Sequence, residues 1–349
     1  MIFYQVNRLF YKPYAINKLL RYVHNETSVS SNVLYPLRSR GLLKVAGEDA
    51  SVFLQGLVTN DMKHLEEGAR SMYAMFLNNK GRVLYDTIIY KWDKEDSFLI
   101  ECDRQLISVL QRHLKIYKLK RKVDIKDVNK DYSLFALTSL NAPNISYVLS
   151  LMPDHFKPVT DSKINVYKDP RLTELGYRVI SYIDVKDSEV AQTVGKDIVS
   201  ERNEDGYKYL RYKLGVSEGA EDLPPGTSFP LEANCDYLHG VSFHKGCYIG
   251  QELTARVHHT GVIRKRIMPL KFNETISKSI ERDSVITASN NPKSNLGKLK
   301  GVVNNYGLGL IRIKEALDAK ILSVGNYSAE AVKPAWWPVE APKELPKTE

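Results

Sequence analysis

Apolar and polar residues alternate along much of the chain with the two-residue period of a β-strand. The alternation is clearest at 71–78 and 82–91, and the turn residues at 78–81 between them predict an antiparallel hairpin. Helical periodicity is clearest at 104–118. Runs of strands interrupted by single helices indicate an α+β fold rather than alternating βαβ units. Further strands are predicted at 41–46, 98–101, 123–128, 133–137 and 177–183, and further helices at 48–57, 188–202 and 205–214.

The last third of the chain has a different pattern, with short strand-like segments separated by Gly and Asn turns. It predicts a small antiparallel β-barrel over 261–335. We assign 38–260 to the α+β body, with one or two subdomains. The segment 336–349 carries prolines and charges, and we expect a disordered tail there. The predicted barrel strands are 262–272, 285–288, 297–304, 308–313 and 320–324.

The first 25 residues carry four basic side chains and no acidic one, since the first acid is Glu26. Their apolar residues can share one helical face, and a Ser/Thr-rich patch follows at 27–31. This composition predicts a mitochondrial targeting presequence over 1–30, and the alternative is an ordinary N-terminal helix of the domain.

Composition narrows the possible sites and partners. The net charge is +9, yet no zinc-finger spacing or RNA-recognition signature is present, so we expect no nucleic-acid partner. No apolar run reaches the ~18 residues of a membrane span. The only cysteines are Cys102, Cys235 and Cys247, without a Cys-x-x-Cys pair. We therefore expect a reducing compartment, and neither a disulfide framework nor a metal site held by this chain alone.

One cysteine stands in an unusual setting. Cys247 follows a short predicted strand at 240–244 and precedes a predicted helix at 249–258, with Lys245 close by. A helix N-terminus and a nearby cation both favour a thiolate, so the pattern indicates a reactive or ligating cysteine. The alternative is a buried cysteine that packs as a small hydrophobe.

The residues around this cysteine resemble the signature of a known family. The motif is Lys245, Gly246, Cys247, Tyr248, Ile249, Gly250, Gln251 and Glu252. It is similar to the signature of the YgfZ family, folate-binding relatives of the glycine-cleavage T-protein, an aminomethyltransferase. The extension through Arg256 to 266 resembles the mitochondrial branch of that family, and the resemblance continues at 40–45, 53–61 and 76–82. It covers about 38–335.

This resemblance implies a T-protein-like body with a C-terminal barrel and a place in the mitochondrial matrix. It also implies work on [4Fe-4S] client proteins beside an A-type scaffold, and possible binding of tetrahydrofolate. Because one thiolate cannot hold a cluster that needs four ligands, Cys247 would share a transient cluster with a partner. His258 or His259 offers a second ligand, or else faces solvent or caps the helix. Arg256 lies four residues after Glu252, so the alternative to a role in the site is an ion pair between these two side chains on the helix surface.

For folate, the resemblance points to Asp86, Arg211 and Glu232. Two departures stand beside them: Tyr85 replaces one acid of the T-protein pair, and Lys213 replaces its substrate-binding glutamate. Both weaken aminomethyl transfer, so we predict a transferase-like fold without assigning an enzymatic activity. The alternatives are a folate-dependent transferase with Asp86 as its acid/base group, and an interaction module with an inert Cys247.

Overall fold

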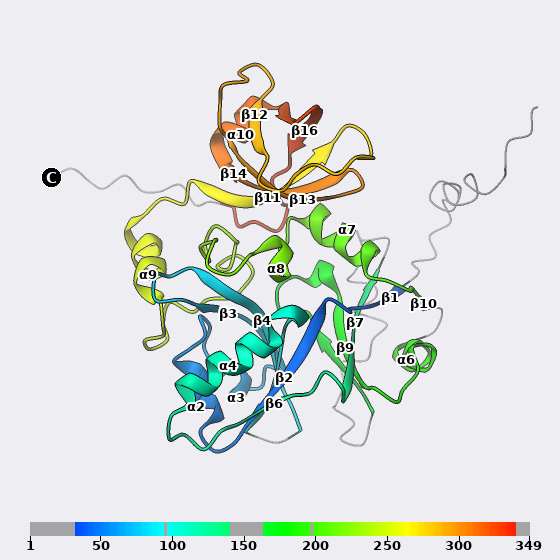
Figure 1. Ribbon diagram of the computed structural model, residues 1–349, viewed down its shortest axis with the longest axis vertical. Coiled ribbons are helices and arrows are strands. Elements are labelled where there is room, and N and C mark those ends of the chain that lie inside the picture. Colours follow the sequence, from blue (N-terminus) through cyan, green and yellow to red (C-terminus); the bar gives the residue numbers. More distant parts are fainter. Residues whose placement is uncertain (1–31, 94–95, 140–162, 196–197, 340–349) are drawn as a thin grey trace, which may run out of the picture.

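The computed structural model describes residues 32–93, 96–139, 163–195 and 198–339. They form a body of two five-stranded sheets with a closed β-barrel above it (Figure 1). The predicted α+β architecture, with mainly antiparallel sheets, is therefore confirmed. The presequence predicted at 1–30 lies outside the described residues. In the part of the chain that the structure describes, no helix is long and apolar enough to cross a bilayer.

The first sheet has the strand order β3-β4-β5-β2-β6, and all its neighbouring strands are antiparallel. The predicted hairpin is present as β3 and β4, closed by a turn in which the Gly81 N–H donates to the Asn78 carbonyl at 2.9 Å. Helices cover one face of the sheet and bury a shared apolar core. The elements are β2 (Arg40–Ala46), α2 (Ala50–Gln55), α3 (Lys63–Glu66), β3 (Ser71–Leu77), β4 (Val83–Lys91), β5 (Ser97–Asp103), η2 (Arg104–Leu106), α4 (Ile107–Lys118) and β6 (Asp124–Asp127).

The second sheet has the order β10-β1-β7-β9-β8, antiparallel except for the short parallel pair β1–β10. Apolar side chains from both sheets share one core, so the two sheets face each other across it. The elements of this half are β1 (Asn32–Pro36), β7 (Tyr132–Ser139), β8 (Ile164–Lys168), η3 (Thr173–Leu175), β9 (Tyr177–Tyr182), α6 (Asp187–Val194), β10 (Val199–Ser200), α7 (Asp205–Leu214) and α8 (Gly219–Asp222).

The barrel closes because β11 pairs with both β14 and β16. It stands over α7 and α8 and is joined to the body through α9 (Gln251–Thr260) (Figure 1). Its elements are β11 (Lys265–Phe272), β12 (Val285–Ala288), β13 (Gly297–Val303), β14 (Tyr306–Arg312), α10 (Ile313–Ala319), β15 (Leu322–Val324) and β16 (Tyr327–Ala331).

The predicted start of the disordered tail, at residue 336, is wrong. Trp337 is buried against Tyr237, with ring centroids 5.7 Å apart, and the Trp336 indole N–H donates to the Leu214 carbonyl at 2.8 Å. Both tryptophans therefore join the barrel to the body, and the described chain continues to residue 339.

Several element boundaries also differ from the prediction. The helix predicted at 188–202 ends at Val194, because Gly195 follows in an extended conformation. Among the described residues, β1 precedes the predicted first strand, and it was missed because it ends in a proline, which is disfavoured within strands. The strand β16 was missed because Ser, Ala and Glu have low strand propensity. The helix predicted at 205–214 is confirmed as α7.

Candidate functional site

The predicted reactive cysteine lies on an exposed loop. Cys247 is a free and exposed thiol, whereas Cys102 and Cys235 are free and fully buried. The helix that follows it, α9, begins at Gln251 and not at 249, because Gly250 adopts the left-handed conformation at its N-cap. Cys247 thus precedes the helix by a full turn of irregular chain, and the loop places its thiol in solvent.

Lys245 fastens this loop to the segment after α2. Its Nζ donates to the carbonyl oxygens of Gln55 at 2.6 Å, Val58 at 2.7 Å and Asn60 at 2.7 Å. Three acceptors match the three N–H bonds of an ammonium group. Burial lowers the pKa of Lys245 to about 8, and the nearby Asp61 carboxylate opposes that shift. The side chain expected to activate Cys247 is therefore engaged as an anchor.

Backbone hydrogen bonds fasten the loop on both sides of Cys247. The Ser242 N–H donates to the Thr59 carbonyl at 3.1 Å, and the Ile249 N–H donates to the Gly56 carbonyl at 3.2 Å. The Thr59 hydroxyl in turn donates to the Gly240 carbonyl at 2.6 Å. The segment 55–60 is thus a platform for the loop.

The remaining motif residues also hold the loop. A Cβ at Gly250 would lie 2.2 Å from the Asn78 carbonyl oxygen, so only glycine fits against the β3–β4 turn. The Tyr248 N–H donates to the Gln251 side-chain oxygen at 3.1 Å, and the buried Tyr248 ring lies 5.0 Å from the Lys245 Nζ. A Cβ at Gly246 would meet nothing within 4 Å. Apart from Gly246, the side chains beside Cys247 thus have structural contacts of their own.

The predicted histidines lie at the end of α9. The His258 ring stacks on Phe243 with 3.5 Å between centroids, and the His259 ring lies 5.2 Å from that of His258. Burial lowers the pKa of His258, and the neighbouring His259 and His244 add to that effect. Within the described residues, no group of three or more His, Cys, Asp or Glu side chains is arranged to hold a metal ion. The ring contacts that the structure gives His258 are with Phe243 and His259.

Glu252 and Arg256 are exposed on α9, with Glu252 in the first turn of the helix. An acidic residue suits the positive end of a helix dipole.

Asp86 is buried in a network of opposite charges between the sheets. Its carboxylate accepts from the Arg40 guanidinium at 3.1 Å and from the Gly219 N–H at 3.0 Å. Burial raises the pKa of Asp86, and the Arg40 charge lowers it. Arg40 also donates to Glu101 at 2.8 Å. Both Asp86 oxygens are engaged by the protein, and only 4% of the residue is exposed.

Arg211 belongs to the same buried network. It donates to Asp222 at 2.7 Å and to the Val216 carbonyl at 3.0 Å, and it lies near Glu218. Lys213, two residues later on α7, is exposed. Sequence patterns missed most of this network, although charged residues within apolar strands were a visible signal. The other members are Arg40, Glu101, Asp169, Arg171, Arg178, Glu218 and Asp222.

Comparison with known proteins finds relatives whose sequences match most of the chain. The chain is 36% identical over 322 residues to the mouse protein "Iron-sulfur cluster assembly factor IBA57, mitochondrial", covering 88% of this chain and 86% of that one. The human protein of the same name is 36% identical over 87% of this chain and 85% of its own length. The chain belongs to the IBA57 family. A Mycosarcoma maydis homologue is 32% identical over 87% of this chain and 84% of its own length.

Family models and a solved structure agree with this membership. A model described as the GCVT N-terminal domain matches residues 24–153, and one described as the CAF17 C-terminal beta-barrel domain matches 264–339. The aminomethyltransferase T of the glycine cleavage system from Bartonella henselae superposes with a TM-score of 0.67. It is 15% identical and covers 87% of this chain and 85% of its own. The predicted T-protein-like fold of this IBA57 family member is thereby confirmed.

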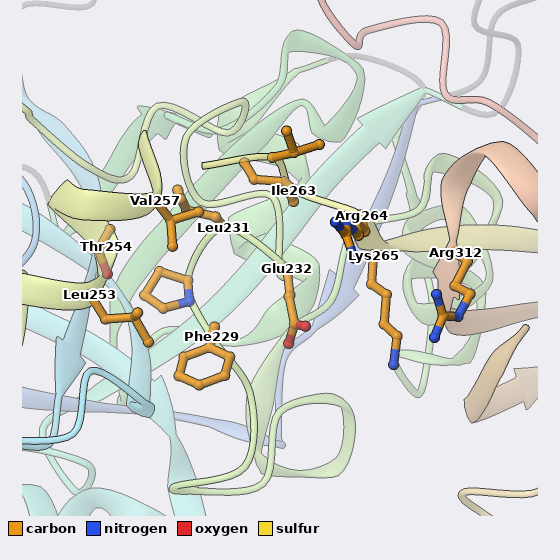
Figure 2. A pocket seen from close by; sticks show the side chains of 12 residues that line it. Phe229, Leu231, Glu232, Leu253, Thr254, Val257, Ile263, Arg264, Lys265 and Arg312 are labelled. Atoms are coloured by element: carbon orange, nitrogen blue, oxygen red, sulfur yellow. The ribbon is translucent and has the colours of Figure 1, made fainter. Parts of the chain in front are cut away.

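The third folate candidate, Glu232, lies apart from Asp86 and Arg211. It lines a cavity of about 480 Å³ between α9, the segment 229–232 and the first residues of β11 (Figure 2). The three residues predicted to bind folate therefore do not share one site in this IBA57 family member. Asp86 and Arg211 pair with other protein groups, whereas Glu232 faces an open space.

Proposed function

We propose that the chain acts in the mitochondrial matrix as an assembly factor in the maturation of [4Fe-4S] proteins, and that Cys247 is the residue that meets the cluster. Membership of the IBA57 family supports the assembly role, because its relatives are named as mitochondrial iron-sulfur cluster assembly factors. The observation that carries the role of Cys247 is its free, exposed thiol on a loop fastened from both sides. Such a loop presents one ligand in a fixed position.

The number of available ligands implies a partner. An iron-sulfur cluster needs four protein ligands, and the other two cysteines of the chain are buried. The cluster is therefore cargo whose remaining ligands come from a partner, for which we propose an A-type scaffold. Ligand exchange suffices for this contact: the Cys247 thiolate forms a bond to iron, and one scaffold thiolate leaves and takes up the proton that Cys247 lost. Neither iron nor sulfur changes oxidation state.

Tetrahydrofolate binding and the transferase alternative stay predictions. A pteridine needs a polar group that faces an open space, yet Asp86 and Arg211 are buried and paired with other protein groups. Glu232 alone faces an open cavity. The residues predicted for folate do not fit it as a set, and we derive no step through it.

The test is anaerobic mixing of the full chain with an A-type scaffold loaded with a [2Fe-2S] cluster, followed by absorption spectra and gel filtration. We expect a coloured heterocomplex with the wild type and none with Cys247→Ser. Cys235→Ala is the matched control, because it removes a thiol that is fully buried. A complex that forms equally well with Cys247→Ser would exclude the ligand role. In that case, calorimetric titration with tetrahydrofolate would test the folate prediction directly.

A further inference from the structure

The cavity beside α9 has two chemically distinct ends. Leu253 and Val257 of α9 lie at one end, and Arg264, Lys265 and Arg312 gather at the other (Figure 2). Its volume of about 480 Å³ is in the range of small-molecule pockets, ~300–1,000 Å³, which are mostly apolar with a few polar groups.

The cationic end has more positive than negative charge. Arg264 and Lys265 have no ion pair within 4 Å among the described residues, and Arg312 reaches only Glu315, at 3.6 Å. Glu232 is the single carboxylate in the lining. Burial raises the pKa of Glu232, although Lys265 lowers it. Three cations around one carboxylate leave capacity for an anion, which they can bind by charge-assisted hydrogen bonds.

The apolar end is mainly aliphatic. Leu231, Leu253 and Val257 contribute to it. Val262 also lines the cavity and is 67% exposed, so it leaves apolar surface for a ligand to cover. The single aromatic ring, Phe229, lies under the Arg82 guanidinium at 4.3 Å. The wall therefore favours a flexible aliphatic group over a stacked ring system.

We propose that this cavity binds a small amphipathic anion, with an aliphatic body between α9 and 229–231 and a carboxylate against Lys265 and Arg264. The site is distinct from the buried ionic network and from the exposed Cys247. It is joined to the Cys247 loop by α9, since Gln251 at the start of that helix accepts from the Tyr248 N–H. A bound ligand would therefore pack against the helix that supports the loop, whether or not the loop meets a cluster.

The test is calorimetric titration of the full chain with nonanoate and with the uncharged 1-nonanol. We expect nonanoate to bind and 1-nonanol to bind at least about tenfold more weakly, because charge-assisted hydrogen bonds contribute that much or more. Lys265→Met should weaken nonanoate binding by a similar factor, and Val257→Trp should abolish it by filling the apolar end. Lys271→Met is the matched control, because this exposed lysine lies on the same strand outside the cavity.

Absence of nonanoate binding to the wild type would overturn the proposal, as would equal binding of acid and alcohol. The same titration with 5-formyltetrahydrofolate separates this site from the folate prediction. Folate binding that Val257→Trp abolishes, without any nonanoate binding, would overturn the aliphatic assignment. Nonanoate binding that requires Lys265 supports it, whatever the chain does with folate.

Discussion

Replacing Lys245 by Met tests whether this side chain holds the Cys247 loop. The change removes three hydrogen bonds from one charged group, and a hydrogen bond to a charged group contributes ~1.5–3 kcal/mol net of desolvation. The three contributions do not add, because they all come from one ammonium group. We expect a net cost of about 2 kcal/mol, concentrated at the loop.

The assay is hydrogen exchange followed by mass spectrometry, together with urea unfolding. A cost of about 2 kcal/mol corresponds to roughly thirtyfold more frequent local opening. Exchange should therefore accelerate in 240–250 and 55–60, where the Ser242 and Ile249 N–H groups donate to platform carbonyls. Lys213→Met is the matched control, because that lysine is exposed and far from the loop in sequence. Unchanged exchange in both segments of Lys245→Met would refute the anchoring role, even if the free energy of unfolding fell.

Three further predictions concern other parts of the molecule. Arg40→Met removes the ion-pair partner of buried Asp86 and leaves Glu101 with Arg178 alone, so urea unfolding should show a loss of ~3–5 kcal/mol; a loss below ~1 kcal/mol would contradict the network. By NMR, His258 should titrate below the ordinary histidine pKa, and Phe243→Ala should bring it back towards that value. Since the unfolded chain then binds more protons between the two pKa values, this group should make the protein less stable as pH falls through that interval. Gly250→Ala should destabilise by more than ~1–2 kcal/mol, because its φ is +77° and its Cβ would meet a carbonyl oxygen at 2.2 Å, whereas Gly246→Ala should have little effect.

Local patterns predicted the sheets and the barrel well because the period of apolar residues is a local property. The hairpin β3–β4 and the helix α7 lie within a residue of their predicted ends. Predictions from the sequence failed where contacts between distant parts of the chain determine the structure. The strand β8 lies at the edge of its sheet in a segment for which no strand was predicted. Trp336 and Trp337 are held by contacts with α7 and with the Tyr237 ring.

The contrast between local signals and long-range contacts also explains which parts of the candidate site were predicted. Glycines and polar neighbours are a local signal, and they set Cys247 apart from the two cysteines that are buried. Its exposure argues against the alternative of a buried, packed thiol, and its reactivity stays a prediction. The role of Lys245 was misread, since its carbonyl partners lie about 190 residues earlier in the chain. Asp86 was recognised as a carboxylate of interest, but the pairing with Arg40 that buries it depends on how β2 and β4 approach each other.

The arrangement of the motif separates two requirements that a shared-cluster ligand must meet. A ligand that a partner can reach must be exposed, and exposed loops lose affinity when they must be ordered on binding. Here the loop is ordered before any partner binds: Lys245 is bound to the platform, Gly250 packs against the hairpin turn, and the Tyr248 N–H donates to Gln251, while the Cys247 thiol stays in solvent. The motif residues beside Cys247 therefore need not touch iron to matter. Substitutions at the anchors should impair cluster transfer by misplacing the thiol, and Cys247→Ser should impair it with the loop still in place.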